Sequence, residues 1–157
     1  MKNFSFKKLA SKLQPIVIRA LNTHMKTNLN AMNDNLDIGQ DINENNFEPL
    51  KATTLNNRAK KGQGTKILEI SGNMRKTKLF QATVSKPVVR LKAIGKSKGK
   101  KKIIYGASHN VGFTTKKGAR VPKREWFGFA KGMKPGGAEY KKMVNTFFLE
   151  ITRAWKI

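Results

Sequence analysis

Apolar residues recur at helical spacing near the N-terminus. Over residues 4–32 they are mostly three or four positions apart, at Leu9, Leu13, Ile16, Val17, Ala20, Leu21, Met25 and Leu29. This spacing gathers them on one face of an amphipathic helix. Proline is tolerated in a first helical turn but kinks a helix interior, so Pro15 predicts that the main helix begins near Gln14. Residues 1–32 are therefore expected to form a basic arm followed by a helix.

The same pattern returns at the C-terminus. Tyr140, Val144, Phe147, Ile151 and Trp155 follow one another at steps of four, three, four and four residues. The charged residues of this stretch fall largely on the other side of the helix. We expect an amphipathic helix over residues 138–155.

The sequence between these two helices contains shorter patterns that predict short helices and strands. Residues 49–61 predict a short helix from Pro49 to the stop at Gly62, and a second is expected after Ser71. Alternation at residues 80–85, with Phe80, Ala82 and Val84 on one face, predicts a strand. Further strands are expected in the segments PVVRLKAI and IIYGA. The fold class is α+β, with a small antiparallel sheet, short helices and long basic loops between two amphipathic terminal helices.

A single domain accommodates these elements, because 157 residues are too few for two comfortable ones. Residues 33–48, NDNLDIGQDINENNFE, are rich in Asn and Asp without a sustained period, and they predict a mobile or partner-ordered connection. Their carboxylates are not placed as in a calcium-binding loop, since Gly39 falls where a ligand is needed. Residues 49–157 form the basic α+β core.

Positive charge dominates the chain and is unevenly placed. There are 33 basic and 9 acidic residues, for a net charge of +24. Residues 1–48 carry a net +1 and residues 49–157 carry +23. Such a surplus suits a polyanionic neighbour, namely nucleic acid, an acidic protein or anionic lipid, or else serves solubility.

Candidate chemistry is sparse. The chain has no cysteine, which excludes disulfides and thiolate sites. Ser108 and His109 are adjacent, and in the expected strand their side chains would point to opposite faces. Few acidic residues are left to orient His109 as a base. We therefore expect no catalytic residue, no metal and no cofactor. The chain also lacks a signal-like apolar stretch or a run of about 18 apolar residues, so we expect no membrane contact.

The candidate contacts with a polyanion are cations in two expected loops. The segment GKSKGKKK between expected strands predicts an exposed hairpin loop, and a second loop precedes VPKREWFG. These candidates are Lys96, Lys98, Lys100, Lys101, Lys102, Lys116, Lys117, Arg120 and Lys123. The neighbouring Trp126 and Phe127 could stack on bases, but core anchoring is the favoured interpretation of these rings.

Several short motifs occur in an order that resembles one known family. An aromatic, Pro-Leu, a threonine and an arginine appear at Phe47, Pro49, Leu50, Thr54 and Arg58. An apolar step and a Ser-Gly pair follow in ILEISGNM, which contains Gly72. Next come Tyr105, His109 and Gly112 in YGASHNVG, and then Pro122, Arg124, Trp126, Phe127 and Gly128. Together they span about residues 47–128, and these residues are candidate interface or core anchors.

This order is similar to that of phage virion morphogenesis proteins, which include tail completion and neck proteins of tailed phages and Mu-like prophages. The resemblance implies a non-enzymatic virion subunit, made in the host cytoplasm, that forms a homo-oligomeric ring at the tail end or the head-tail junction. It implies contact with tail tube, terminator or connector proteins, and we expect the basic loops to face either packaged DNA or acidic neighbouring proteins. Gly106, Asn110 and the strongly basic loop depart from the usual pattern.

Two other classes remain open. A stand-alone nucleic-acid-binding protein is suggested by the +23 on residues 49–157 and would bind DNA or RNA without a partner. An enzyme such as a cell-wall hydrolase would need a carboxylate pair, for which the sequence offers no good candidate.

Overall fold

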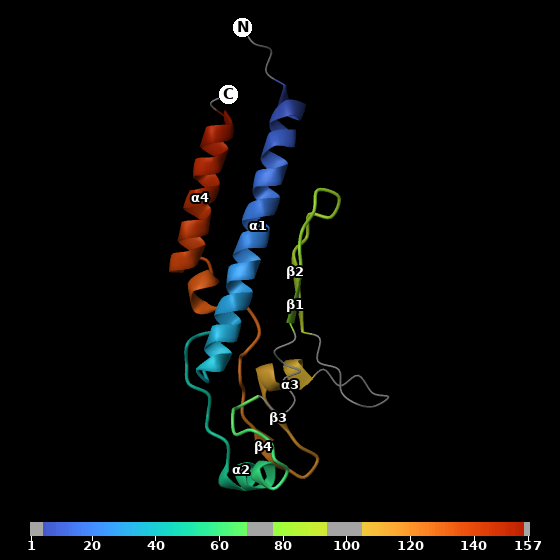
Figure 1. The fold of residues 1–157 in the computed structure, drawn as a ribbon, viewed down its shortest axis with the longest axis vertical. Helices are drawn as coiled ribbons and strands as arrows, with labels where there is room; N and C mark the ends of the chain where they lie inside the picture. Colours follow the sequence, from blue (N-terminus) through green and yellow to red (C-terminus); the bar gives the residue numbers. More distant parts are fainter. Residues whose placement is uncertain (1–4, 69–76, 94–104, 156–157) are drawn as a thin grey trace.

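The computed structural model describes residues 5–68, 77–93 and 105–155. The chain forms an elongated molecule whose long axis follows two helices, α1 and α4 (Figure 1). Both termini lie at one end of this axis, and short helices and strands form the opposite end, here called the base. The expected α+β class, with a helix at each end of the sequence and antiparallel strands between them, is confirmed.

Helix α1 runs without interruption from Phe6 to Asp37, 32 residues, and contains Pro15 in its interior. The prediction of a separate arm before a main helix near Gln14 is therefore wrong. A proline removes one backbone hydrogen bond, to the carbonyl four residues earlier. On both sides of Pro15 the apolar face stays in register, with Leu13 half-buried and Ile16 buried, and this packing holds the two halves as one helix.

Helix α4 spans Ala138–Trp155, as its periodicity predicts. It follows a short 3-10 helix, η2, at Lys131–Met133. It packs antiparallel to α1 (Figure 1), and one ion pair joins the helices, with 3.8 Å between Arg19 Nη1 and Glu150 Oε1. No residue of α4 is fully buried, so the helix is covered along one side only.

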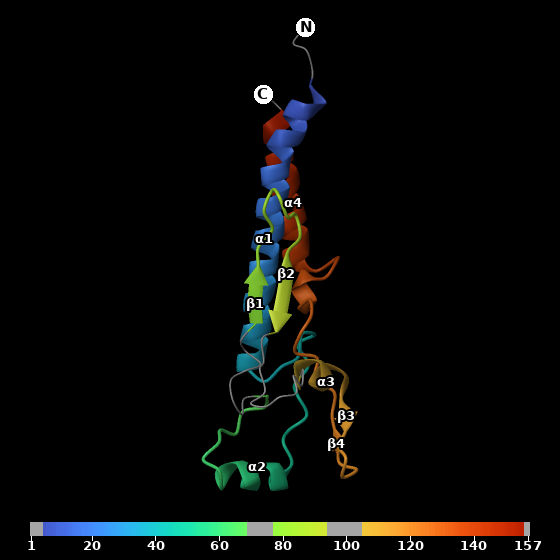
Figure 2. The ribbon, with the colours of Figure 1, turned by 90° about the vertical axis from the view of Figure 1, so that its right-hand side faces the viewer.

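A two-stranded hairpin lies along the other side of α1 (Figure 2). Strands β1 (Thr77–Phe80) and β2 (Arg90–Ala93) pair antiparallel, with Thr77 opposite Ala93 and Phe80 opposite Arg90. The strand expected in PVVRLKAI is thus found, but Thr77–Phe80 contradicts a helix over the end of SGNMRKTKLF. Residues 71–76 lie outside the described ranges.

The face predicted by alternation at residues 80–85 is wrong. The strand ends at Phe80, whose side chain is exposed, as is that of Val84. Of these three residues only Ala82 is buried, and the Asn22 side chain of α1 binds its C=O and N–H. The hairpin is therefore joined to α1 by contacts of β1 and by these side chain-to-backbone hydrogen bonds just beyond the strand.

Four short elements build the base. Helix α2 (Ala52–Ala59) confirms the short helix predicted before Gly62. Helix α3 (Tyr105–Val111) replaces the strand expected in IIYGA, of which residues 103–104 lie outside the described ranges. A short apolar run does not distinguish strand from helix, and Gly112, with φ +74°, provides the left-handed residue that commonly ends a helix. Strands β3 (Phe113–Thr114) and β4 (Arg120–Val121) form a second antiparallel hairpin.

Residues 33–48 do not form the loose connection that their composition predicts. The first five continue α1 to Asp37, and the rest form a loop held from within. The Asp41 carboxylate accepts hydrogen bonds from the N–H groups of Asn43 and Asn45 at 2.7 and 2.9 Å. Ile42 and Phe47 are buried. The Asn and Asp residues thus shape a turn by bonding to nearby backbone.

Candidate functional site

Several of the described residues singled out by the family resemblance lie at the base, where Phe47, Trp126 and Phe127 pack together. The indole of Trp126 is 2% exposed and packs in one cluster with Leu36 and Phe47. Phe127 borders this cluster, and its ring centroid lies 5.4 Å from that of Trp126. Trp126 is therefore placed as a core anchor, because a buried ring is not available to stack on a base.

Arg58 and Arg124 are also buried, and both bind backbone carbonyls. Arg58 Nη1 donates to Gly64 O and Lys66 O at 3.2 and 2.8 Å, and Arg124 Nη2 donates to Glu48 O at 3.2 Å. Among the described residues neither guanidinium has a carboxylate within ion-pair distance. Burial lowers the pKa of Arg124; Glu48 opposes this shift and Arg58 adds to it. These arginines cross-link the segments that wrap the base.

His109 belongs to helix α3 rather than to a strand end. Its backbone carbonyl accepts a hydrogen bond from Arg124 N–H at 2.8 Å, and its ring meets Phe113 edge-on with centroids 5.5 Å apart. Burial, and then the charge of Arg124, lower the pKa of His109. Within the part of the chain that the structure describes, its buried Nδ1 has no hydrogen-bond partner. The imidazole is thus placed to pack as a neutral ring.

Two glycines of the same motifs sit where a side chain would collide. A Cβ at Gly112 would lie 2.9 Å from Lys123 N, and one at Gly128 would lie 2.8 Å from the Cδ1 of Ile42. The other motif residues are less buried or lie outside the described ranges. Pro49 is exposed, Leu50 and Pro122 are half-buried, Tyr105 begins α3, and Gly72 lies outside the described ranges.

Three asparagines to which the sequence assigned no structural role join segments that are far apart in the chain. Each side-chain amide both donates to and accepts from an extended segment, as a neighbouring strand would. Asn22 binds the C=O and N–H of Ala82 at 3.0 and 2.7 Å, and Asn110 binds those of Phe127 at 2.8 and 3.1 Å. Asn28 binds Gly128 O and Ala130 N–H, both at 2.9 Å.

The candidate cations separate into two groups. Lys96, Lys98, Lys100, Lys101 and Lys102 lie outside the described residues. Lys116, Lys117, Arg120 and Lys123 are all exposed and lie on or beside the β3–β4 hairpin. The turn is closed by hydrogen bonds between Thr115 N–H and Ala119 O and between Ala119 N–H and Thr115 Oγ1, at 2.9 and 3.1 Å. An open groove of about 240 Å³ runs beside the hairpin and is lined by Arg120 and Lys123.

A second groove, of about 260 Å³, lies between α1 and α4. His24 lines it and stacks on Phe129, with ring centroids 6.1 Å apart, while Tyr140 approaches edge-on at the same distance. Burial lowers the pKa of His24. The groove reflects incomplete packing between the two helices, since α4 has no fully buried residue.

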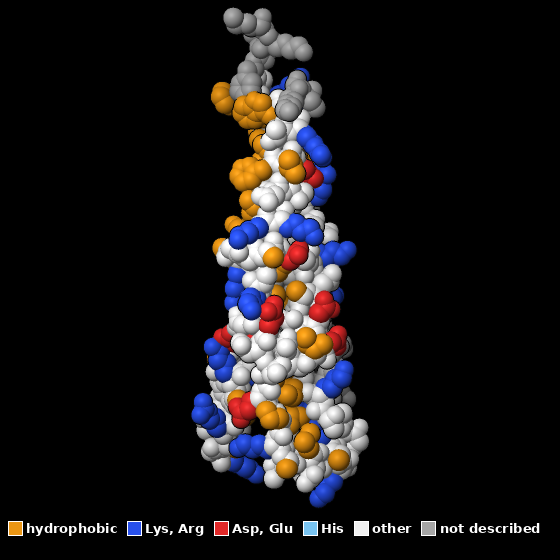
Figure 3. All heavy atoms as spheres, turned by 90° about the vertical axis from the view of Figure 1, so that its left-hand side faces the viewer, with side chains coloured by type: hydrophobic (Ala, Val, Ile, Leu, Met, Phe, Trp, Pro, Cys, Tyr) orange, Lys and Arg blue, Asp and Glu red, His pale blue; other side chains and the backbone are white. Residues whose placement is uncertain are grey.

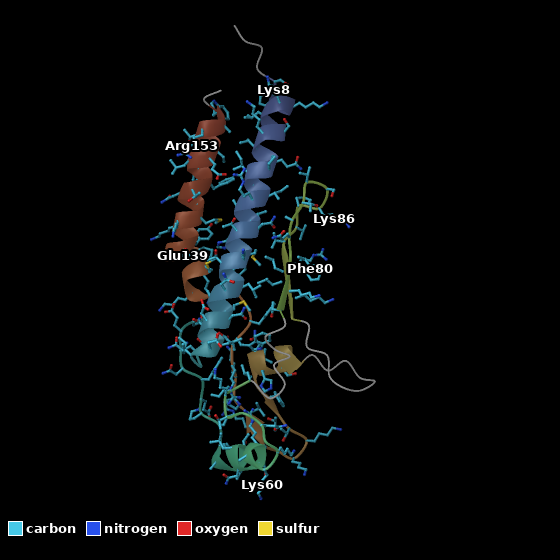
Figure 4. The ribbon with its side chains drawn as sticks, viewed as in Figure 1. Lys8, Lys60, Phe80, Lys86, Glu139 and Arg153 are labelled. Carbon is cyan, nitrogen blue, oxygen red and sulfur yellow. The ribbon has the colours of Figure 1, made fainter. Side chains whose placement is uncertain are left out.

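Large apolar side chains are exposed near the end that carries both termini. Phe6, Phe148, Leu149 and Trp155 are each between 59 and 79% exposed. Figure 3 shows hydrophobic side chains gathered along one edge of the helical hairpin at this end. Figure 4 places Lys8 and Arg153 at the same end, with Lys60 at the base. The helical end thus combines exposed apolar surface with flanking cations.

Comparison of the chain with family models, with curated proteins and with solved structures gives no match. Within the described residues, no group of His, Cys, Asp and Glu side chains is arranged to hold a metal ion. No helix in those residues is both long enough and apolar enough to cross a bilayer.

Proposed function

We propose that this chain is a structural subunit of a phage or phage-like virion, of the tail completion or neck type. In this role it forms a homo-oligomeric ring at the tail end or at the head-tail junction. Its partners are other copies of itself and neighbouring tail tube, terminator or connector proteins. It contributes surfaces to an assembly and performs no reaction.

The observation that carries the proposal is the amount of surface left uncovered. Among the described residues the core cluster around Trp126 is small, and α4 has no fully buried residue. Large apolar side chains on both long helices are exposed, Phe6, Phe148, Leu149 and Trp155 among them. A chain with this little burial gains stability when neighbours cover it.

The outer face of α4 is the first surface that a neighbouring copy would cover. Phe148 and Leu149 are exposed on it, close to the polar Asn145 and Thr152. Exposed aromatic and aliphatic residues on a rigid helix are typical anchors of protein interfaces. Among the described residues, the ion pair that joins α1 to α4 is that of Arg19 with Glu150, at the solvent-exposed edge of the helical hairpin. Packing against the next subunit would complete it.

A stand-alone nucleic-acid-binding protein is the second candidate function. It is favoured by the exposed cations of the β3–β4 hairpin and by the net charge of +24. It predicts tight binding of purified protein to DNA or RNA in the absence of any partner, with a steep dependence on salt. It does not account for the exposed apolar face of α4.

The experiment that separates the two functions is electron microscopy of particles produced without this chain. The assembly proposal expects unjoined heads and tails or tails of defective length, and full repair when the wild-type chain is supplied. Normal infectious particles in the absence of the chain would overturn it. A nucleic-acid-binding role alone would leave the joining of heads to tails intact.

A further inference from the structure

The β3–β4 hairpin carries a concentration of unpaired positive charge at the base. Lys116 and Lys117 occupy its turn and Arg120 its second strand, and all three are exposed. None of them has a carboxylate within ion-pair distance among the described residues. Figures 1 and 2 both place this hairpin at the end of the molecule opposite the termini. It is therefore available to a large ligand.

Lys123 differs from these three. Its ammonium forms an ion pair with Glu125, whose carboxylate also accepts a hydrogen bond from Asn43 Nδ2 at 2.7 Å. The contact with Lys123, despite partial burial of the carboxylate, lowers the pKa of Glu125, so the acid stays charged. Glu125 thus neutralises Lys123 locally, and the free charge of the hairpin is that of the other three residues.

The composition of the hairpin favours nucleic acid over an acidic protein. The segment between Thr114 and Arg120 has no large apolar residue, whereas protein interfaces are anchored by aromatic and aliphatic side chains. Phosphate groups need only cations and hydrogen-bond donors. A narrow antiparallel ribbon also fits the major groove of a duplex.

The same composition favours a duplex over a single strand. Proteins that hold single strands stack bases on exposed rings. The turn residues 115–119 include no aromatic ring, and the ring of Phe113 in β3 already contacts His109 edge-on. Thr115 Oγ1 accepts a hydrogen bond within the turn, which leaves Lys116, Lys117 and Arg120 as the groups that can bind phosphate oxygens. The contact would be to the phosphate backbone, without sequence preference.

We infer that the β3–β4 hairpin binds the phosphate backbone of double-stranded DNA through Lys116, Lys117 and Arg120, and that Lys123 contributes little. This inference rests on the proposed function only in assigning the contact to packaged DNA within a particle. Its test uses the purified chain alone, so its failure and the failure of the assembly proposal are distinguishable. In a ring, the hairpins would line the path of packaged DNA.

The test measures affinity for a short DNA duplex as a function of salt concentration. The triple variant Lys116→Gln, Lys117→Gln, Arg120→Gln removes three of the exposed charges. If these contact phosphates, the slope of log affinity against log salt becomes shallower by about 2–3, at about 0.9 per phosphate contact. The single variant Lys123→Gln should leave the slope nearly unchanged.

A matched control removes the same charge from the other end of the molecule. Lys7, Lys8 and Arg153 are exposed there, on α1 and α4. Their change to Gln should alter the slope by less than half as much as the hairpin variant does. Equal slopes for the two triple variants would overturn the inference, as would absence of duplex binding by the wild type. Loss of affinity for polyglutamate but not for the duplex in the hairpin variant would assign the hairpin to an acidic protein instead.

Discussion

Asn28, buried in the C-terminal half of α1, accepts a hydrogen bond at 2.9 Å from the backbone N–H of Ala130, which lies 102 residues later in the sequence. Its amide nitrogen donates to Gly128 O at the same distance. One side chain thus fastens the long helix to the segment that leads from the base to α4. The helical end and the base are joined at this point.

Replacement of Asn28 by alanine should destabilise the fold strongly. The change leaves the N–H of Ala130 and the carbonyl of Gly128 without partners in a buried site. Loss of these hydrogen bonds should lower the free energy of unfolding by about 2–4 kcal/mol. Chemical denaturation followed by circular dichroism measures this, with the exposed Asn30→Ala on the same helix as control. Equal effects of the two changes would contradict the role assigned to Asn28.

Gly112 and Gly118 offer a matched pair at the β3–β4 hairpin. Both have positive φ, +74° and +77°, but a Cβ at Gly112 would collide with the Lys123 backbone, while one at Gly118 would meet no atom. Gly118→Ala should lower the free energy of unfolding by about 1 kcal/mol, because alanine adopts the left-handed conformation less readily than glycine does. Gly112→Ala should lower the free energy of unfolding by about 2 kcal/mol more, because its Cβ would also clash with the backbone of Lys123. Thermal unfolding of both variants checks this, and similar melting temperatures would refute the close approach at Gly112.

Stability should fall as the solution is acidified through the range in which histidine titrates. Burial lowers the pKa of His24, and burial and then Arg124 lower that of His109, below the ordinary value of 6.5. The unfolded chain therefore takes up protons at a higher pH than the folded chain does. The two imidazoles therefore contribute fully to the free energy of unfolding above about pH 6.5. This contribution is lost as the pH falls through the lower pKa values that they have in the folded chain.

Denaturation curves measured from about pH 8 to about pH 5 test this linkage. The double variant His24→Gln, His109→Gln should show a flatter dependence of unfolding free energy on pH than the wild type does, whatever its absolute stability. An unchanged slope in the variant would show that other groups cause the dependence.

The exposed apolar residues of α4 should matter for assembly and not for folding. Phe148→Ser with Leu149→Ser changes two side chains that are 60 and 59% exposed, so the free energy of unfolding should change by less than about 1 kcal/mol. Complementation with this variant should nevertheless leave heads and tails unjoined. The control Asn145→Ser, exposed on the same helix, should complement fully. Full complementation by the double variant would show that the outer face of α4 does not belong to the subunit interface.

The sequence predicts the elements whose periodicity is long, and fails where a distant segment decides the structure. Residues 138–155 form the expected helix because five apolar residues mark one face. By contrast, Asn22, Asn28 and Asn110 look like ordinary surface residues, since their partners are 17 to 102 positions away. The buried loop at Asp41 was missed for the same reason: its polar composition conceals the contacts of Ile42 and Phe47.

Only part of the candidate site could be predicted from the sequence, because burial and pairing depend on distant segments. The described motif residues Phe47, Trp126 and Phe127 pack together at the base, and burial places Arg58, Arg124 and Trp126 within the fold. Sequence alone does not separate an arginine that binds carbonyls from one that faces solvent. The exposed cations of the β3–β4 hairpin follow from composition, whereas the neutralisation of Lys123 by Glu125 needs the geometry.

The most direct test of the assembly role is a single-particle electron microscopy map of the intact particle. We predict that this chain forms a closed ring at the tail end or the head-tail junction, with the outer face of α4 covered by a neighbouring copy. Particles that are complete and infectious but contain no density for this chain would contradict it.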